Sequence, residues 1–129
     1  MAVYQATVPW VSILLRRVFG VAGAAHGNAE SLNPRYAWPS GDWGSLPIEG
    51  GVQAAYRREI EAAPDPDAHR QAIEERLERY RSPMRVAEAL GIEEIIDPRD
   101  TRPLLCDWVE LAYERLPEKT GIKRRKMRV

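Results

Sequence analysis

The stretch best suited to chemistry is residues 16–27, where an apolar run ends and small residues follow. We predict a buried strand from about Trp10 to Arg16 and a short helix from Gly20 to about Gly27 or Asn28. The first N–H groups of such a helix have no partner within it, and they favour a negatively charged oxygen. This pattern is typical of an oxyanion hole. Close packing of a helix on a sheet gives the same small-residue composition, so the stretch alone leaves both interpretations open.

Few other side chains have a pattern that indicates catalysis. His26 follows the small-residue stretch and is able to move a proton, but we favour the interpretation of a hydrogen-bonded structural histidine. We expect His69 on an exposed helix face and Cys106 as a small buried residue. These three residues lack the spacing of metal ligands, so we expect no metal.

Charged residues gather in one loop and at the C-terminus. We expect the loop residues to cap and brace the chain, with phosphate contact by the arginines as the alternative: Asp97, Arg99, Asp100 and Arg102. Residues 117–129 form a basic tail, which we interpret as a solvated end. The formal net charge of the whole chain is +0, so we expect no nucleic-acid partner and no membrane partner.

Length and composition limit the class of protein. A chain of 129 residues is one domain at most. Its single cysteine, Cys106, cannot form an internal disulfide, which fits a reducing compartment. The N-terminal apolar run is interrupted by polar residues and is too short to span a bilayer, so we expect no secretory signal and a cytoplasmic protein.

The remaining elements are predicted from hydrophobic spacing and from turn residues. We expect the end of a helix at residues 1–7 and short strands at 35–39, 43–46 and 92–96. Two helices are expected from 50 to 63 and from 68 to about 81, and a third begins at Ser82-Pro83 and closes at Gly91. The last helix runs to about Leu116 and ends at Pro117.

Each predicted helix has an apolar face and a charged face. The expected buried stripes are Val52, Tyr56 and Ile60; Ala68, Ile73, Leu77 and Tyr80; and Leu105, Trp108, Val109, Ala112 and Leu116. We interpret the arginines from Arg70 to Arg81 as a solvated face. The order of elements predicts an α/β fold with too few strands for a closed sheet, so we hypothesise a piece of a larger domain.

Seven motifs, in order along nearly the whole chain, make this sequence resemble the C-terminal domain of the carboxyltransferase (β) subunit of biotin-dependent acyl-CoA carboxylases. They are residues 8–11, 16–22, 36–39, 50–52, 56–60, 80–83 and 91–102. The Asp-Pro-Arg-Asp-Thr-Arg stretch at 97–102 is the most specific of them. The resemblance implies a partial crotonase-like fold of stacked ββα turns, with residues 1–129 as the latter portion of that domain.

The resemblance also implies a function and partners. The family moves a carboxyl group from carboxybiotin to the α carbon of an acyl-CoA, and biotin is carried on a partner protein. Expected partners are acyl-CoA, a biotin carboxylase or biotin carboxyl carrier subunit, the N-terminal carboxyltransferase half and further copies of the subunit. A biotin-dependent decarboxylase and a non-catalytic fragment or assembly module remain open alternatives.

By the same resemblance, the backbone amides of Val21 and Ala22 hold the biotin ureido oxygen, and Gly20 to Gly23 form the biotin-binding turn. Val21 stands where many members have glycine, which a backbone donor tolerates unless the site needs a positive φ. Ala24 lies after the turn, at a position that influences which acyl group the family's enzymes prefer. Gly23 and Ala24 replace larger residues there, which suggests a pocket for a longer or branched acyl chain.

Overall fold

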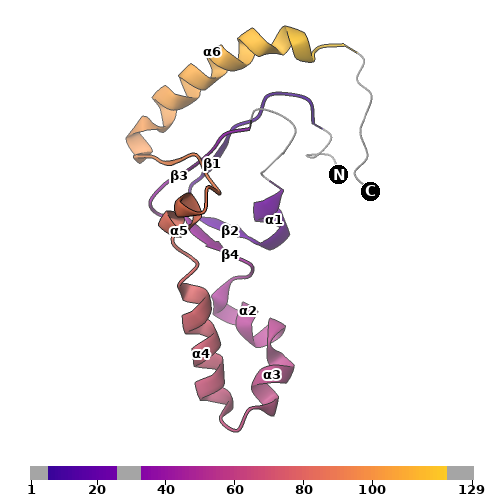
Figure 1. The fold of residues 1–129 in the computed structure, drawn as a ribbon, viewed down its shortest axis with the longest axis vertical. Helices are drawn as coiled ribbons and strands as arrows, with labels where there is room; N and C mark the ends of the chain where they lie inside the picture. Colours follow the sequence, from indigo (N-terminus) through magenta and orange to yellow (C-terminus); the bar gives the residue numbers. More distant parts are fainter. Residues whose placement is uncertain (1–5, 26–32, 122–129) are drawn as a thin grey trace.

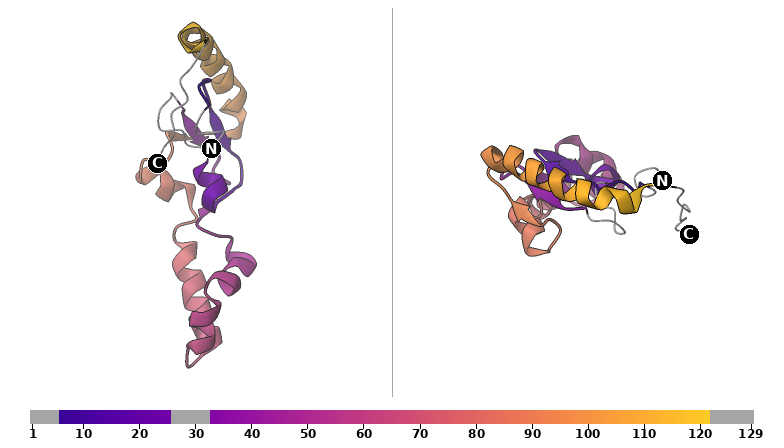
Figure 2. Two further views of the ribbon diagram at one scale, coloured as in Figure 1. Left: turned by 90° about the vertical axis from the view of Figure 1, so that its right-hand side faces the viewer. Right: turned by 90° about the horizontal axis from the view of Figure 1, so that it is seen from above.

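The computed structural model describes residues 6–25 and 33–121, and the chain is elongated (Figure 1). Two small sheets occupy the middle. A long helix, α6 (Thr101–Lys119), crosses one end. An arm of three helices extends from the other end, formed by α2 (Ile48–Ala55), α3 (Arg57–Ala62) and α4 (Pro66–Glu78). The side view keeps this order of parts (Figure 2). In the described ranges, no helix is both long and apolar enough to cross a bilayer.

The strands are short and all run parallel. One sheet has the order β1-β3-β5, formed by Ser12–Leu14, Arg35–Ala37 and Glu94–Ile95. A second sheet pairs β2 with β4, formed by Arg17–Phe19 and Asp42–Gly44. The mixed α/β class and the short strands near 35–39, 43–46 and 92–96 are confirmed.

The predicted strand over residues 10–16 is wrong in its extent, because the chain changes sheets at Leu15 and Arg16. The carbonyl of Leu15 accepts a hydrogen bond from the Ser40 hydroxyl at 2.7 Å, and the Arg16 carbonyl accepts one from the Asp42 N–H at 2.7 Å. These bonds end β1 and begin β2. A continuous apolar run therefore contains two strands, which hydrophobicity alone does not separate.

The main core lies between the three-stranded sheet and α5 (Pro83–Glu88). Leu14, Ala37 and Ile92 are buried there, and partly buried Val18, Trp43, Val86, Ala87 and Ile95 pack around them. Ser82 caps α5 by accepting a hydrogen bond from the Met84 N–H, as predicted. All four tryptophans are only half-buried, so the rings lie at the margins of the core rather than within it.

Gly91 does not close α5 in the way the sequence suggests. The left-handed residue is Leu90, with φ +54°, and its side chain is 90% exposed. The N–H of Gly91 donates to the Val86 carbonyl, and the N–H of Leu90 donates to the Ala87 carbonyl. Position 91 requires glycine for a steric reason, because a Cβ there would lie 2.7 Å from Val86 Cγ1.

The helical arm has a small core of its own. It consists of α2 (Ile48–Ala55), α3 (Arg57–Ala62) and α4 (Pro66–Glu78). The predicted helix over 50–63 is broken at Tyr56, whose φ of −108° and ψ of 16° leave the helical range. Val52, Ile60 and Ile73 are buried together. Ala68 and Tyr80 were expected on the buried stripe of α4, but both are exposed.

The C-terminal helix departs most from the prediction. The Asp97 side chain caps the short 3₁₀ helix η1 (Pro98–Asp100), and Asp100 is the N-cap residue of α6 (Thr101–Lys119), although its side chain makes no capping hydrogen bond. The helix continues through Pro117. Its expected stripe is only half-buried or exposed, and Cys106 is exposed rather than buried. Residues 1–5, His26 and most of the basic tail lie outside the described residues.

Candidate functional site

The predicted turn begins where β2 ends. Helix α1 (Gly20–Ala24) follows Phe19 directly, and Gly20 adopts a left-handed φ of +56°. A side chain there would be strained, and its Cβ would lie 3.1 Å from the Ser45 carbonyl oxygen. Phe19 is an extended N-cap whose side chain makes no capping hydrogen bond. The helix itself therefore offers no acceptor to the N–H groups of Val21 and Ala22.

Two residues of this turn have different environments. Val21 is 87% exposed, so the outer surface of the turn is open to solvent. Gly23 faces inward, because a Cβ on it would lie 2.6 Å from Val18 Cγ1. Packing on β2 thus explains the small size of Gly23. The binding role predicted for Gly23 and the specificity role predicted for Ala24 both stay predictions.

The substitution of Val21 for glycine is compatible with this geometry. Among the described residues other than glycine, only Leu90 has a positive φ. The left-handed conformation falls on Gly20 instead, one position earlier. A β-branched residue at position 21 therefore leaves the turn unstrained, and its amide remains a donor.

Strand β4 lies beside the turn and contacts it at one end. Phe19 of β2 pairs with Gly44, and a Cβ on Gly44 would lie 3.4 Å from the Phe19 ring. Ser45, the next residue, approaches Gly20 as described above. The position of the turn therefore depends on where β4 is held.

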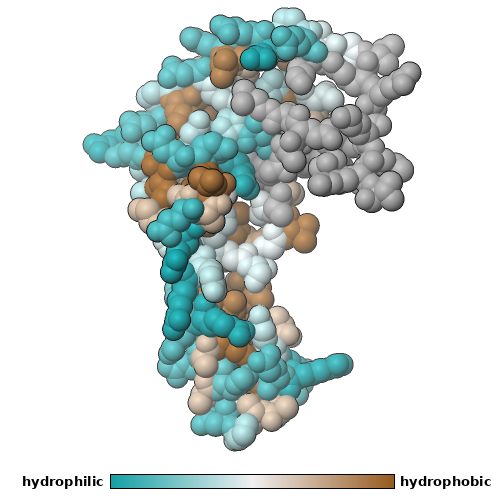
Figure 3. Space-filling model, viewed as in Figure 1, coloured by the Kyte–Doolittle hydropathy of each residue, from teal (hydrophilic) through white to brown (hydrophobic). Residues whose placement is uncertain are grey.

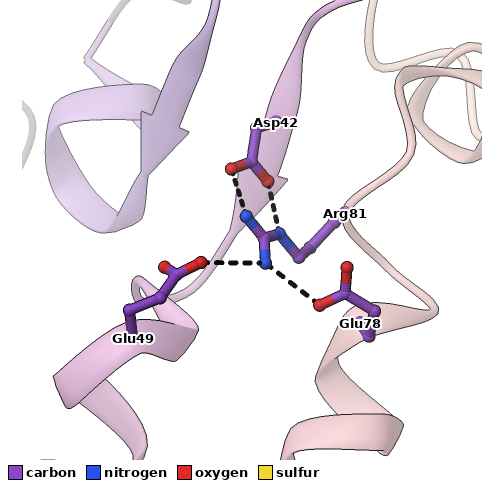
Figure 4. Close-up of polar contacts among 4 residues, drawn as sticks. All are labelled: Asp42, Glu49, Glu78 and Arg81. Carbon is purple, nitrogen blue, oxygen red and sulfur yellow. Dashed lines mark hydrogen bonds and ion pairs between the residues drawn. The ribbon is translucent and has the colours of Figure 1, made fainter.

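An ion-pair cluster around Arg81 holds the other end of β4 (Figure 4). The guanidinium donates to both carboxylate oxygens of Asp42, with Nε–Oδ1 at 2.6 Å and Nη2–Oδ2 at 2.5 Å. Its Nη1 lies 3.0 Å from Glu78 Oε2 and 3.5 Å from Glu49 Oε1. The side chains of Arg81 and Asp42 are 20% and 17% exposed, whereas both glutamates are mostly exposed.

The electrostatics of the cluster follow from this geometry. The hydrogen bonds from Arg81 lower the pKa of the Asp42 carboxyl, although its partial burial opposes that shift. The same bonds raise the pKa of the Arg81 guanidinium. The sequence prediction placed Arg81 on a solvated face, which is wrong. Its partner Asp42 is far away in sequence, so no local spacing could have found the pair.

Charged groups elsewhere brace loops, as predicted for the region around residue 97. Arg99 Nη2 lies 2.7 Å from Asp97 Oδ2, and its hydrogen bonds lower the pKa of that carboxyl. A groove of about 690 Å³ runs from this loop along α6 past Arg102 and Cys106. Phosphate contact there stays a prediction. His69, expected on an exposed helix face, is half-buried, and its Nε2 lies 2.9 Å from Glu59 Oε1.

The chain matches the family model for the carboxyl transferase domain over residues 1–127. The chain belongs to the carboxyl transferase domain family. Among its relatives, the methylmalonyl-CoA carboxyltransferase 12S subunit of Propionibacterium freudenreichii is 35% identical over 83% of this chain and 21% of that protein. A propionyl-CoA carboxylase carboxyltransferase subunit of Haloferax mediterranei is 36% identical over 76% of this chain and 19% of that protein.

Solved structures of the family confirm the predicted fold. The transcarboxylase 12S crystal structure, described as a hexamer with substrate bound, superimposes with a TM-score of 0.64 at 30% identity. The match covers 99% of this carboxyl transferase chain and 24% of that chain. The geranyl-CoA carboxylase β subunit of Pseudomonas aeruginosa gives a TM-score of 0.77 at 18% identity, which supports the fold alone. The chain thus has a partial crotonase-like carboxyltransferase fold and spans about a fifth of the length of these relatives.

Proposed function

We propose that this chain is the biotin-facing part of an acyl-CoA carboxyltransferase, which moves a carboxyl group from carboxybiotin to the α carbon of an acyl-CoA. The observation that supports it is the left-handed Gly20 turn at the end of β2, followed by the first-turn amides of Val21 and Ala22. Two main-chain donors at one turn suit a single oxygen that gains negative charge.

The donor set of the turn fits the ureido group of biotin, because one carbonyl oxygen accepts two N–H groups. When bound, carboxybiotin supplies the carboxyl group that is transferred. The amides of Val21 and Ala22 orient the ureido oxygen and stabilise its growing negative charge. Gly20 provides the left-handed backbone conformation from which the helix that carries these amides begins.

The proposal includes partners that the chain does not contain. Acyl-CoA binds with the help of an N-terminal carboxyltransferase half, and a biotin carboxylase or biotin carboxyl carrier subunit delivers the biotin. Association into a homo-oligomer agrees with the hexamer described for the transcarboxylase relative. The cytoplasmic location expected from the single cysteine belongs to the same proposal.

The decisive experiment replaces Gly20 in the chain complemented with a polypeptide that supplies the first part of the domain. Gly20→Ala strains the turn and crowds the Ser45 carbonyl, so carboxyl transfer should fall by about a hundredfold. Gly50→Ala is the matched control, because Gly50 has a φ of +78° with nothing within 4 Å of a Cβ. Equal activity of the two variants would contradict the proposed role of the turn.

One observation favours the alternative of a non-catalytic fragment. The chain covers only 21% of the Propionibacterium freudenreichii relative and 19% of the Haloferax mediterranei relative. Transfer from free carboxybiotin by the 129-residue chain alone would exclude it. Transfer only after the upstream polypeptide is added would identify a split subunit. No transfer in either case would leave an assembly module.

A decarboxylase is the second candidate activity, because the methylmalonyl-CoA decarboxylase α subunit of Propionigenium modestum is 28% identical over 90% of the chain. The same turn serves both directions of transfer. The complemented chain is incubated with carboxybiotin and an acyl-CoA, and separately with a carboxylated acyl-CoA and free biotin, and the initial rate of carboxyl transfer is measured in each direction. A faster transfer to biotin supports the decarboxylase, and a faster transfer to the acyl-CoA supports the carboxylase.

We also propose that Ala24 admits a longer or branched acyl chain, whereas the small size of Gly23 is explained by its packing on Val18. Turnover of short, branched and long acyl-CoAs by the complemented enzyme tests this proposal. A strict preference for acetyl-CoA would contradict it.

A further inference from the structure

We infer that Arg81 is a positioning residue for the Gly20 turn, acting through strand β4. This inference rests on the proposed function for the role of the turn, but its structural part is tested independently below. Arg81 lies far from the turn in sequence, at the end of the helical arm. It reaches the turn through two steps, its bonds to β4 and the contacts of β4 with the turn.

The first step is the way Arg81 holds the beginning of β4. Its guanidinium makes a two-pronged contact with the Asp42 carboxylate, and its main-chain carbonyl accepts from the Trp43 N–H at 3.0 Å. Glu78 and Glu49 hold the same guanidinium from α4 and α2. Side chain and backbone of one residue thus fix two consecutive residues of the strand.

The second step is the dependence of the turn on β4. The β2–β4 sheet has only three residue pairs, from Arg17–Asp42 to Phe19–Gly44. A two-stranded pair of this length is marginal by itself. It begins at the Arg81 contact and ends at the approach of Ser45 to Gly20. Anything that lets β4 move therefore lets the Gly20 turn move with it.

Arginine suits this role where lysine does not. The planar guanidinium donates from Nε and Nη2 to the two Asp42 oxygens and still offers Nη1 to the glutamates. An ammonium group has one nitrogen and cannot bridge the same three carboxylates with fixed geometry. Arg81→Lys therefore keeps the charge and removes the alignment, which makes it the most informative variant.

The first test measures amide hydrogen exchange in the 129-residue chain. In Arg81→Lys, segments 16–22 and 41–46 should exchange roughly tenfold faster, while segments 12–15 and 35–38 stay unchanged. Arg85→Lys is the matched control, because Arg85 is an exposed arginine of the neighbouring helix whose guanidinium Nη1 lies 3.7 Å from Glu88 Oε2. Uniform acceleration along the whole chain, or none, would overturn the inference.

The second test measures transfer kinetics in the complemented enzyme. Arg81→Lys should lower kcat by roughly tenfold and leave the KM for acyl-CoA within about twofold, because only the orientation of the turn changes. Asp42→Asn should give the same split, and the double variant should be no worse than either single one. Additive losses, or a change confined to KM, would overturn the inference.

The two proposals fail in distinguishable ways. If Gly20→Ala abolishes transfer while Arg81→Lys alters neither exchange nor kcat, the positioning role of Arg81 fails alone. If Arg81→Lys loosens residues 16–22 but neither it nor Gly20→Ala changes transfer, the proposed function of the turn fails. The structural coupling from Arg81 to the turn then stands.

Discussion

The helical arm and α6 are both amphipathic by sequence, yet only the arm buries its apolar face. Val52 is fully buried in the arm, with Ile73 at 3% exposed and Ile60 at 4%. Helix α6, the longest in the described ranges, has no buried residue among positions 101–118. Apolar surface also reaches the exterior along α6 and around α5 (Figure 3).

This difference between the arm and α6 indicates which helical region finds its packing partners within this chain. The arm is formed from three consecutive helices that fold back on one another, so its three buried residues lie within residues 48–78, and Leu46 just before α2 packs against them. Helix α6 stands away from the sheets (Figure 1), and the Trp108 Nε1–H is buried with no hydrogen-bond partner among residues 6–25 and 33–121. An orphaned donor and an open apolar face are expected of a helix whose neighbours belong to the rest of the domain.

The largest expected effect is in the arm. Ile73→Ala removes a side chain from a core of only three buried residues, so the free energy of unfolding should fall by about 3 kcal/mol. Urea denaturation followed by circular dichroism measures it. A loss below about 1 kcal/mol would mean that the arm is not independently packed.

The next effect lies where the arm meets the sheet. Asp42→Asn removes the charge that Arg81 faces, and the free energy of unfolding at pH 7 should fall by about 2 kcal/mol. The pKa of Asp42 is lowered in the folded chain, so the folded state binds fewer protons than the unfolded state. The contribution is therefore complete above the usual aspartate pKa of about 3.9 and is lost as the pH falls through the folded value.

Urea midpoints between pH 6 and pH 2.5 test the sign of this effect. The wild-type midpoint should fall more steeply with acid than that of Asp42→Asn. Asp97→Asn is the control, since the pKa of Asp97 is also lowered but its ion pair with Arg99 is exposed. Parallel curves for wild type and Asp42→Asn would show that the Asp42–Arg81 pair does not join the arm to the sheet.

A smaller effect of opposite sign is expected at the end of α5. Leu90→Gly relieves a left-handed backbone without losing packing, because the side chain is 90% exposed. The free energy of unfolding should rise by roughly 0.5–1 kcal/mol. Ala89→Gly, at a φ of −84°, should lower it instead. Destabilisation by both changes would indicate that Leu90 packs against something in solution.

Local chemistry in the sequence predicted a large part of this fold. The cap at Ser82, the helix start at Gly20 and the short strand near residue 36 depend on neighbours within a few residues. The resemblance identified the family, which the comparisons confirm. The oxyanion role of Val21 and Ala22 stays a prediction, because the structure supplies only the geometry of the turn.

Long-range contacts explain what was missed. The local sequence predicts a solvated Arg81, because its ion-pair partner Asp42 lies 39 positions away on another element. The apolar stripe of α6 was predicted to be buried, because hydrophobic periodicity indicates that a helix has an apolar face. It does not indicate whether another element packs against that face. A glycine is expected at the left-handed position after a helix, but Leu90 occupies it. The glycine lies at position 91 instead, because a Cβ there would lie 2.7 Å from Val86 Cγ1.

The smallest expected effect completes the comparison between the arm and α6. Leu105 is half-buried and lines the groove of about 690 Å³ along α6. Leu105→Ala should change the free energy of unfolding of the 129-residue chain by less than about 0.5 kcal/mol, because no closed core surrounds the side chain. The same urea titration measures it beside Ile73→Ala. A loss near that of Ile73→Ala would mean that α6 folds onto the sheets in solution, and the difference between the two helical regions would then disappear.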